Sequence, residues 1–207
     1  MKGSNTIRAV IWDLGGVIVR THDHTGRARW EKRLGLRPGQ LEQIVFTCET
    51  AGQAYVGQAQ VDEVWRAVTN QLGVPDTERQ AIEHDFWSGD RVDYQLVDYV
   101  RSLRPHHKTA LLSNAWNDLR GLLNDQWKIT DAFDQITISA EVGLAKPDPR
   151  IYILPLEALG IAAPQAVFVD DFKINILAAQ DVGLRTIHFR NPQQAIAELD
   201  DLLSGSN

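Results

Sequence analysis

Short apolar runs that end abruptly in polar residues constrain the fold of this chain more than any other feature. The first run covers residues 9–12 and ends at Asp13, which is followed closely by the glycine pair Gly15 and Gly16. A β-branched apolar run of this length is typical of a buried parallel strand rather than a helix. We therefore expect Asp13 at the C-terminal end of a strand, the edge at which open α/β sheets bind ligands.

Runs of the same kind recur in the second half of the chain and alternate with helical patterns. We expect four further strands, at residues 109–112, 135–138, 166–169 and 185–189. Helices are expected over 92–103, 118–124 and 174–182, from Pro149, and from Pro192. Strands and helices in alternation predict a parallel sheet with helices on both faces. Within the helix that starts at Pro149, Pro155 predicts a kink or an early end because proline removes a backbone hydrogen bond.

The segment between the first strand and the second carries a different, wholly helical pattern. Its clearest helix covers residues 61–72, where the apolar positions line one face and Gly73 marks the end. Three more helices are expected, over 27–34, 38–49 and 77–87. The aromatic residues of this segment are more typical of a bundle core than of a ligand platform; they are Trp30, Phe46, Tyr55, Trp65, Phe86 and Trp87. We therefore expect a small four-helix domain inserted into an α/β fold.

Charge and cysteine content restrict the classes of partner. The formal net charge of −6 argues against nucleic acid and anionic membranes as partners, because both are acidic. A small ligand is the expected partner. Cys48 is the single cysteine and suits a reducing compartment. Because the chain also lacks an apolar stretch of the ~20 residues that a membrane span needs, and its first residues lack the apolar core of a signal peptide, we expect a cytoplasmic protein, as a monomer or homodimer.

Polar residues follow three further strands or the turns after them. Ser113 and Asn114 end the second strand, where they suit equally a helix cap and the binding of phosphate oxygens. Lys146 lies in a restricted segment between a glycine turn and a Pro-x-Pro pair, which indicates a fixed position. Asp170 and Asp171 end the fourth strand.

Two adjacent carboxylates repel each other unless a cation or hydrogen bonds offset their charge. Because the carboxyl ends of parallel strands share one edge of the sheet, Asp13 is expected close to Asp170 and Asp171. Three carboxylates at one place predict a hard divalent cation, and Mg²⁺ suits oxygen ligands best.

In these motifs the sequence resembles the haloacid dehalogenase superfamily of hydrolases, most of which are phosphatases. The similarity includes Ile11 to Val17, Leu112 to Asn114, Ala145 to Pro149, and Phe168 to Asp171 with Asn175. The resemblance implies a Rossmann-like catalytic core, formed by residues 1–19 and 89–207, and a helical cap domain, formed by residues 20–88. It covers nearly the whole chain.

The resemblance also implies a role for each matching residue in phosphoryl transfer. Asp13 corresponds to the nucleophile that forms an aspartyl-phosphate. Ser113, together with the backbone at Asn114, would hold the oxygens of the transferring group. Lys146 would offset the charge of Asp13 and of the phosphoryl group. The backbone at Gly15 and Gly16 would contact the substrate, because glycine lets a ligand approach main-chain groups closely.

For the metal, the resemblance implies Mg²⁺ bound by Asp13, the Gly15 carbonyl and Asp171, with Asp170 bound directly or through water. Dehalogenases of the superfamily work without this metal, so the acidic pair argues against dehalogenation.

One position departs from the family pattern. Phosphatases of the superfamily usually carry a second aspartate two residues after the nucleophile, which protonates the leaving group, and here this residue is Gly15. Loss of a general acid typically costs 10²–10⁴-fold in rate, although good leaving groups suffer less. A group from the cap entrance is one possible replacement, and the candidates are His22, Asp23, His24 and Glu49.

We therefore expect a Mg²⁺-dependent phosphatase that hydrolyses a phosphoric monoester or acyl phosphate of a small metabolite. One alternative is a catalytically weak protein of the same fold that binds a phosphorylated ligand, a hypothesis that Gly15 motivates. Another is a phosphomutase or phosphonate-cleaving hydrolase of the superfamily. A phosphonate-cleaving enzyme would need a cap lysine to form an imine, and Lys32 is the single lysine of the cap segment.

Overall fold

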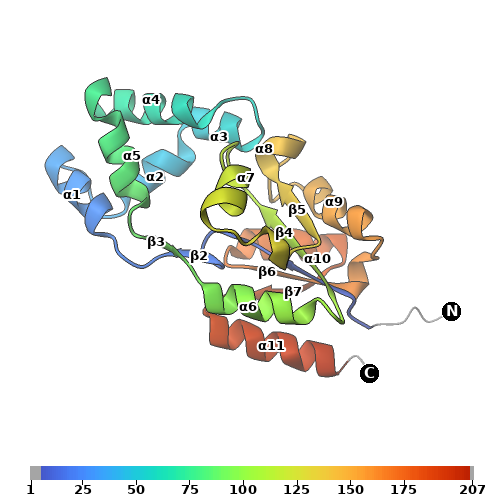
Figure 1. Ribbon diagram of the computed structural model, residues 1–207. Coiled ribbons are helices and arrows are strands. Elements are labelled where there is room, and N and C mark those ends of the chain that lie inside the picture. The colour runs from blue at the N-terminus through green and yellow to red at the C-terminus, as the bar shows by residue number, and fades with distance from the viewer. Residues whose placement is uncertain (1–5, 206–207) are drawn as a thin grey trace.

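The computed structural model describes residues 6–205, and a five-stranded sheet forms its centre (Figure 1). Its strand order is β5-β4-β1-β6-β7, and every neighbouring pair is parallel. The strands are β1 (Ala9–Trp12), β4 (Lys108–Ser113), β5 (Gln135–Ile138), β6 (Ala166–Asp170) and β7 (Arg185–His188). The prediction of a parallel α/β sheet is confirmed. Residues 1–5 and 206–207 of the expected core lie outside the described part of the chain.

Helices cover both faces of this sheet (Figure 1). Val10 and Trp12 of β1 pack on one face, against α6 (Tyr94–Leu103) and α11 (Pro192–Ser204). On the other face, Ile11 packs against α9 (Pro149–Leu159) and α10 (Lys173–Val182). Because both faces are buried, the strands are apolar throughout, which explains the short apolar runs of the sequence.

The helix α9 runs through Pro155 and ends at Leu159, so the expected early end at Pro155 is wrong. Pro155 is itself buried, as are Tyr152 and Leu156 beside it. Packing of this helix face on the sheet offsets the lost backbone hydrogen bond, which costs ~3 kcal/mol.

Shorter elements join the strands: α7 (Leu119–Gly121), a π-helical turn (Leu122–Gln126), α8 (Ser139–Val142), and 3-10 turns at Thr130–Ala132 and Ala163–Gln165.

Helices α1 to α5 form a separate group at one end of the sheet (Figure 1). They are α1 (Thr25–Leu34), α2 (Gln40–Thr47), α3 (Glu49–Tyr55), α4 (Val61–Leu72) and α5 (Arg79–Trp87), and a 3-10 turn at Asp76–Glu78 precedes α5. The group has five helices rather than four, because Cys48 adopts an extended conformation and separates α2 from α3. The sequence pattern missed α3 because this helix buries only Ala51 and Ala54.

A two-stranded antiparallel ribbon joins the helical group to the sheet (Figure 1). It consists of β2 (Val19–Thr21) and β3 (Asp90–Val92). The sequence predicted neither strand, since three residues are too few for a periodic pattern. The ribbon lies where the boundaries between residues 19 and 20 and between 88 and 89 are expected, although the division into core and cap domains stays a prediction.

Candidate active site

The backbone of Asp13 continues directly from β1 and lies between β4 and β6. Its N–H donates to the Val169 carbonyl oxygen at 2.9 Å, which fixes it at the C-terminal edge of the sheet. The residue is 5% exposed, and the Leu14 N–H donates to its Oδ1 at 2.7 Å. The structure therefore places this carboxylate where the apolar run predicts it.

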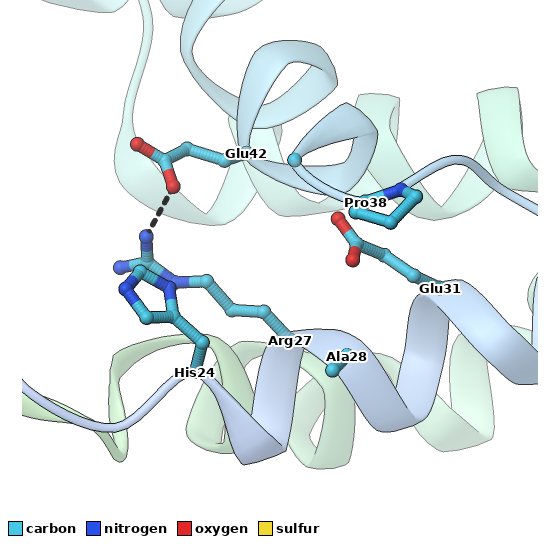
Figure 2. A pocket seen from close by; sticks show the side chains of 7 residues that line it. His24, Arg27, Ala28, Glu31, Pro38 and Glu42 are labelled. Atoms are coloured by element: carbon cyan, nitrogen blue, oxygen red, sulfur yellow. Dashed lines mark hydrogen bonds and ion pairs between the residues drawn. The ribbon is translucent and has the colours of Figure 1, made fainter.

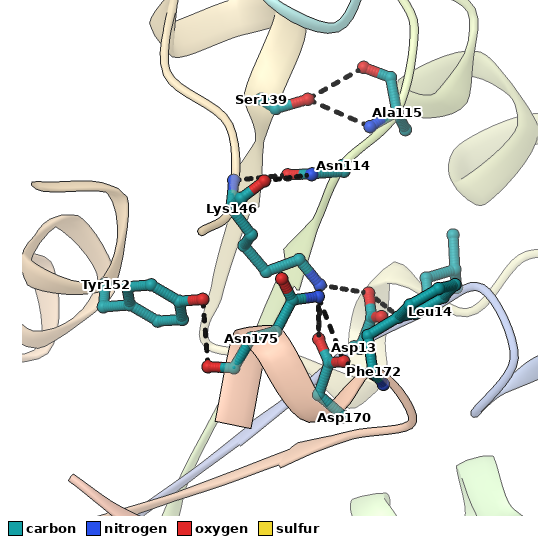
Figure 3. A network of polar contacts seen from close by, with 10 residues as sticks. All are labelled: Asp13, Leu14, Asn114, Ala115, Ser139, Lys146, Tyr152, Asp170, Phe172 and Asn175. Carbon is teal, nitrogen blue, oxygen red and sulfur yellow. Dashed lines mark hydrogen bonds and ion pairs between the residues drawn. The ribbon is translucent and has the colours of Figure 1, made fainter. Parts of the chain in front are cut away.

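Lys146 joins Asp13 to the next strand end. Its Nζ lies 2.8 Å from Asp13 Oδ1 and 2.7 Å from Asp170 Oδ2 (Figure 3). The Asn114 side chain holds the lysine backbone from both sides, because its Oδ1 accepts from the Lys146 N–H and its Nδ2 donates to the Lys146 carbonyl, each at 2.8 Å. Lys146 is thus fixed at its backbone and at its ammonium group.

Asp170 is fully buried and its two oxygens are both hydrogen-bonded. Oδ1 accepts from the Phe172 N–H at 2.7 Å, and Asn175 Nδ2 lies 3.1 Å from Oδ1 and 3.0 Å from Oδ2. Tyr152 donates its hydroxyl to the Asn175 carbonyl at 3.1 Å (Figure 3). Asn175 belongs to the sequence motifs, which assign it no role; the structure shows that it orients Asp170.

Asp171 differs from Asp170 because one of its oxygens is free. Within the described residues, its Oδ1 is buried and has no hydrogen-bond partner. Its backbone carbonyl lies 2.9 Å from Nε2 of His188, a residue at the end of β7 that the sequence analysis did not single out. A buried carboxylate oxygen without a partner is unfavourable. A bound cation would satisfy this oxygen.

The three carboxylates together form a cluster suited to a divalent cation. One oxygen from each of Asp13, Asp170 and Asp171 lies within 4.8 Å of the others. When all three are ionised, Lys146 is the single cation bound to them within residues 6–205, which leaves an excess of two negative charges. Carboxylate oxygens are hard ligands, so the residues present fit Mg²⁺.

The pKa values reflect this crowding. Burial and the charge of Asp170 raise the pKa of Asp171 to about 6. Burial raises the pKa of Asp13 as well, and the charge of Asp170 adds to this effect while Lys146 opposes it. Burial alone would lower the pKa of Lys146, but the carboxylates of Asp13 and Asp170 outweigh this and raise it. A bound cation would relieve the repulsion among these carboxylates.

The structure also brings the predicted phosphate-binding residues to this edge. Ser113 is the last residue of β4 and is 3% exposed. The loop after it is held by Ser139, whose Oγ accepts from the Ala115 N–H at 3.0 Å and donates to the Ala115 carbonyl at 3.1 Å (Figure 3). The phosphate-binding role of Ser113 and Asn114 stays a prediction, as does that of Gly15 and Gly16.

The four residues considered as replacements for the missing general acid make their contacts outside the Asp13 cluster. Asp23 accepts a hydrogen bond from the Thr25 N–H at 2.8 Å, and Glu49 is exposed at the start of α3. His22 lines a surface groove beside Arg20 and Arg91. Across residues 6–205, none of the side chains of His22, Asp23, His24 and Glu49 has a hydrogen bond or ion pair with the Asp13 cluster.

His24 lines a cavity of about 320 Å³ between α1 and α2 (Figure 2). Polar contacts beside this cavity hold the two helices together. Arg27 is buried, contacts Glu42 Oε2 at 2.6 Å and donates to the Phe86 carbonyl at 3.0 Å. Glu31 accepts from the Leu41 N–H at 3.2 Å. Every one of these contacts is internal to the helical group, so they explain its architecture rather than a reaction.

The loop after Asn114 is bound to the helical group, a feature that the sequence analysis missed. The Trp116 ring lies 6.3 Å from that of Phe46, 6.0 Å from that of Tyr55 and 6.2 Å from that of Trp87, measured between centroids. Asn117 Nδ2 also donates to Gln60 Oε1 at 2.6 Å. The loop that carries the predicted phosphate-binding residues is therefore part of the contact between the sheet and the helices.

The family model for haloacid dehalogenase-like hydrolases matches residues 7–183, a range that contains Asp13, Ser113, Lys146, Asp170 and Asp171. The chain belongs to the haloacid dehalogenase-like hydrolases. The resemblance seen in the sequence motifs is therefore confirmed, and the protein belongs to a family of enzymes.

Two phosphatases of comparable length are similar to this family member. A sesquiterpene phosphatase of Aspergillus oryzae is 27% identical, and the alignment covers 96% of this chain and 97% of that protein. A D-ribitol-5-phosphate phosphatase of Bacteroides thetaiotaomicron is 24% identical and covers 96% and 99%, respectively. The bifunctional epoxide hydrolase 2 of Sus scrofa is 28% identical, but this chain spans only 38% of its length.

Solved structures confirm the fold of the family. A HAD family enzyme from Bacteroides thetaiotaomicron, in complex with magnesium and inorganic phosphate, superposes with a TM-score of 0.73 at 24% identity, covering 89% of this chain and 94% of that one. The L-2-haloacid dehalogenase of Xanthobacter autotrophicus has a TM-score of 0.66 at 23% identity, covering 97% of this chain and 84% of that one.

Between residues 6 and 205, no helix has the length and apolarity needed to cross a membrane.

Proposed function

We propose that this hydrolase is a Mg²⁺-dependent phosphatase that acts on a small phosphorylated metabolite through an aspartyl-phosphate. The observation that carries the proposal is the buried Oδ1 of Asp171, which has no hydrogen-bond partner among the described residues and lies in one cluster with carboxylate oxygens of Asp13 and Asp170. The full-length similarity to two phosphatases supports the same reaction class.

In this proposal Asp13 is the nucleophile. The Lys146 ammonium group and the Leu14 N–H both contact Asp13 Oδ1, so they fix the orientation of the carboxylate that attacks phosphorus. The Ser113 hydroxyl and the backbone N–H of Asn114 would donate to the phosphoryl oxygens. Lys146 would offset part of the charge on the transferring group, and such charge stabilisation is the main source of rate in phosphoryl transfer.

Mg²⁺ would be held by Asp13, Asp170, Asp171 and the Gly15 carbonyl. When bound, it would neutralise charge on the phosphoryl oxygens and orient the group. Neighbouring residues would hold the ligands of the ion in place. Asn175 and the Phe172 N–H fix the Asp170 carboxylate. The contact between His188 and the backbone carbonyl of Asp171 holds that residue.

Other activities find less support in the structure. Lys32 is exposed on α1, whereas an imine-forming lysine of a phosphonate-cleaving enzyme needs a site that lowers its pKa by desolvation or a nearby cation. A protein that only binds phosphorylated ligands would not need a nucleophile buried beside a lysine. A dehalogenase of the superfamily works without the metal, so it would not need the acidic cluster.

Hydrolysis of p-nitrophenyl phosphate and acetyl phosphate, with Mg²⁺ and with a chelator, tests this function. We expect turnover that requires Mg²⁺ and is lost in Asp13→Asn, while the exposed control Asp125→Asn keeps it. Mass spectrometry of acid-quenched protein should find phosphate on Asp13. Equal rates for the parent and Asp13→Asn would instead indicate a binding protein. A panel of phosphorylated metabolites would then identify the substrate.

A further inference from the structure

The neighbouring glycines Gly15 and Gly16 meet different structural demands. Gly16 has a φ of +76°, and a Cβ there would lie 2.1 Å from Asp171 Oδ2, so only glycine fits. Gly15 is exposed and has no positive φ, and a Cβ there would meet no atom within 4 Å. The backbone therefore does not require glycine at position 15, and open space adjoins this residue two positions after the nucleophile.

The charged side chains that cluster with Asp13 have other roles in the site. Lys146 is shared between Asp13 and Asp170. Asp170 accepts from the Phe172 N–H and the Asn175 amide, and Asp171, whose Oδ1 has no partner among the described residues, would bind the expected cation. For the residues that the structure describes, the contacts made to the Asp13 carboxylate come from Lys146 and the Leu14 N–H. None of these groups is available to give a proton to a departing oxygen.

We propose that the leaving group departs as an anion, without a proton from the protein, and that the site therefore selects phosphates whose leaving group is a stable anion. Acyl phosphates and anomeric sugar phosphates share this chemistry, whereas alkyl phosphates lack it. The inference rests on the proposed phosphatase function and adds the substrate class.

The reaction balances without a general acid. An Asp13 carboxylate oxygen forms a bond to phosphorus while the bond from phosphorus to the leaving oxygen breaks, and the electron pair departs with that oxygen. The resulting anion takes its proton from water afterwards. A water molecule then attacks phosphorus in the aspartyl-phosphate, the electron pair of the breaking bond returns to the Asp13 carboxylate, and the proton of the water passes to solvent.

The first test compares kcat/KM across one series of esters: nitrophenyl, phenyl and alkyl phosphate. General acid catalysis is typically worth 10²–10⁴-fold, so rates should fall steeply, by at least about 10²-fold from nitrophenyl to alkyl phosphate. Acetyl phosphate, and glucose 1-phosphate set against glucose 6-phosphate, distinguish acyl from anomeric substrates. Equal rates across the series would overturn the inference but leave the phosphatase function in place. Failure to hydrolyse any of these esters would reject both.

The second test places an acid in the open space. Gly15→Asp should raise alkyl phosphate hydrolysis by about 10²-fold and flatten the dependence on the leaving group. Gly15→Asn has the same shape without a carboxyl group and should keep the steep dependence, whatever its absolute rate. The inference fails if Asn flattens the series as Asp does, or if a folded Gly15→Asp variant stays as steep as the parent. If either variant fails to fold, by circular dichroism, the ester series of the parent decides.

Discussion

The Lys146 ammonium nitrogen lies 2.8 Å from Asp13 Oδ1 in a site from which water is almost excluded. The same nitrogen contacts Asp170, and the lysine backbone is bound by Asn114, so one residue ties together the ends of β1, β4 and β6. Buried charges are tolerated when they are paired, and loss of one partner leaves an uncompensated charge. Lys146 is therefore both a candidate catalytic group and a structural one.

Replacement of this lysine should affect stability as well as rate. Lys146→Met leaves Asp13 and Asp170 buried without a cation, so we expect the free energy of unfolding to fall by about 3–5 kcal/mol and turnover to be lost. Urea denaturation in Mg²⁺-free buffer measures the first effect. Lys32→Met, on the exposed face of α1, is the control and should change stability by less than about 0.5 kcal/mol. Unchanged unfolding of Lys146→Met would contradict the charge argument.

Mg²⁺ should stabilise the folded protein through the acidic cluster. A ligand at about 100 times its dissociation constant adds about 2.7 kcal/mol to the free energy of unfolding. The midpoint temperature of unfolding should therefore rise when Mg²⁺ is added and fall back when a chelator removes it. Asp171→Asn removes one charge of the cluster and should lose most of this shift, whereas Asp23→Asn should keep it. A full shift in Asp171→Asn would show that the ion binds elsewhere.

Protons should compete with Mg²⁺ at Asp171. Burial and the Asp170 charge raise the pKa of this carboxyl from its ordinary 3.8 to about 6 in the metal-free protein. Because the folded pKa is raised, this group makes metal-free protein less stable as pH rises between these two values. Binding requires the ionised form, so the apparent Mg²⁺ affinity should fall as pH drops through about 6. Titration calorimetry on both sides of that pH measures this, and affinity that is independent of pH would refute it.

The two glycines after the nucleophile should respond differently to alanine. Gly16→Ala forces a Cβ against Asp171 Oδ2 and strains a left-handed backbone, so it should cost at least about 1–2 kcal/mol and weaken Mg²⁺ binding. Gly15→Ala meets open space and should leave Mg²⁺ affinity within about twofold of the parent. Titration calorimetry with Mg²⁺ compares the two variants. Similar losses of Mg²⁺ affinity in both would contradict the different surroundings of Gly15 and Gly16.

Trp116 should couple the helices to the site. Removal of its ring from the cluster with Phe46, Tyr55 and Trp87 leaves a large cavity, so Trp116→Ala should destabilise the protein by about 3–5 kcal/mol. We also expect a lower kcat/KM, since the loop with Ser113 loses its anchor. Trp116→Phe should recover most of both losses. Normal kinetics in a folded Trp116→Ala variant would show that the contact is structural alone.

Much of the architecture follows from local patterns. Residues 9–12 and 166–169 are apolar at every position because each strand is buried on both faces, so a local run reveals a central strand. The parallel order of strands then requires Asp13 and Asp170 to share one edge. Local patterns do not predict the short elements, because β2 and β3 have three residues each and α3 buries only alanines. Their stability comes from neighbours that are distant in the sequence.

The sequence by itself determined which residue types end the strands, and so the acidic character of the site and its family. Only the tertiary structure decided that Asn114 holds Lys146, that Asn175 orients Asp170, and that Trp116 enters the helical group. It also decided that Gly15, unlike Gly16, has open space beside it. The physical reason is range: periodic burial is written into consecutive residues, whereas these contacts depend on distances between segments that meet only after folding.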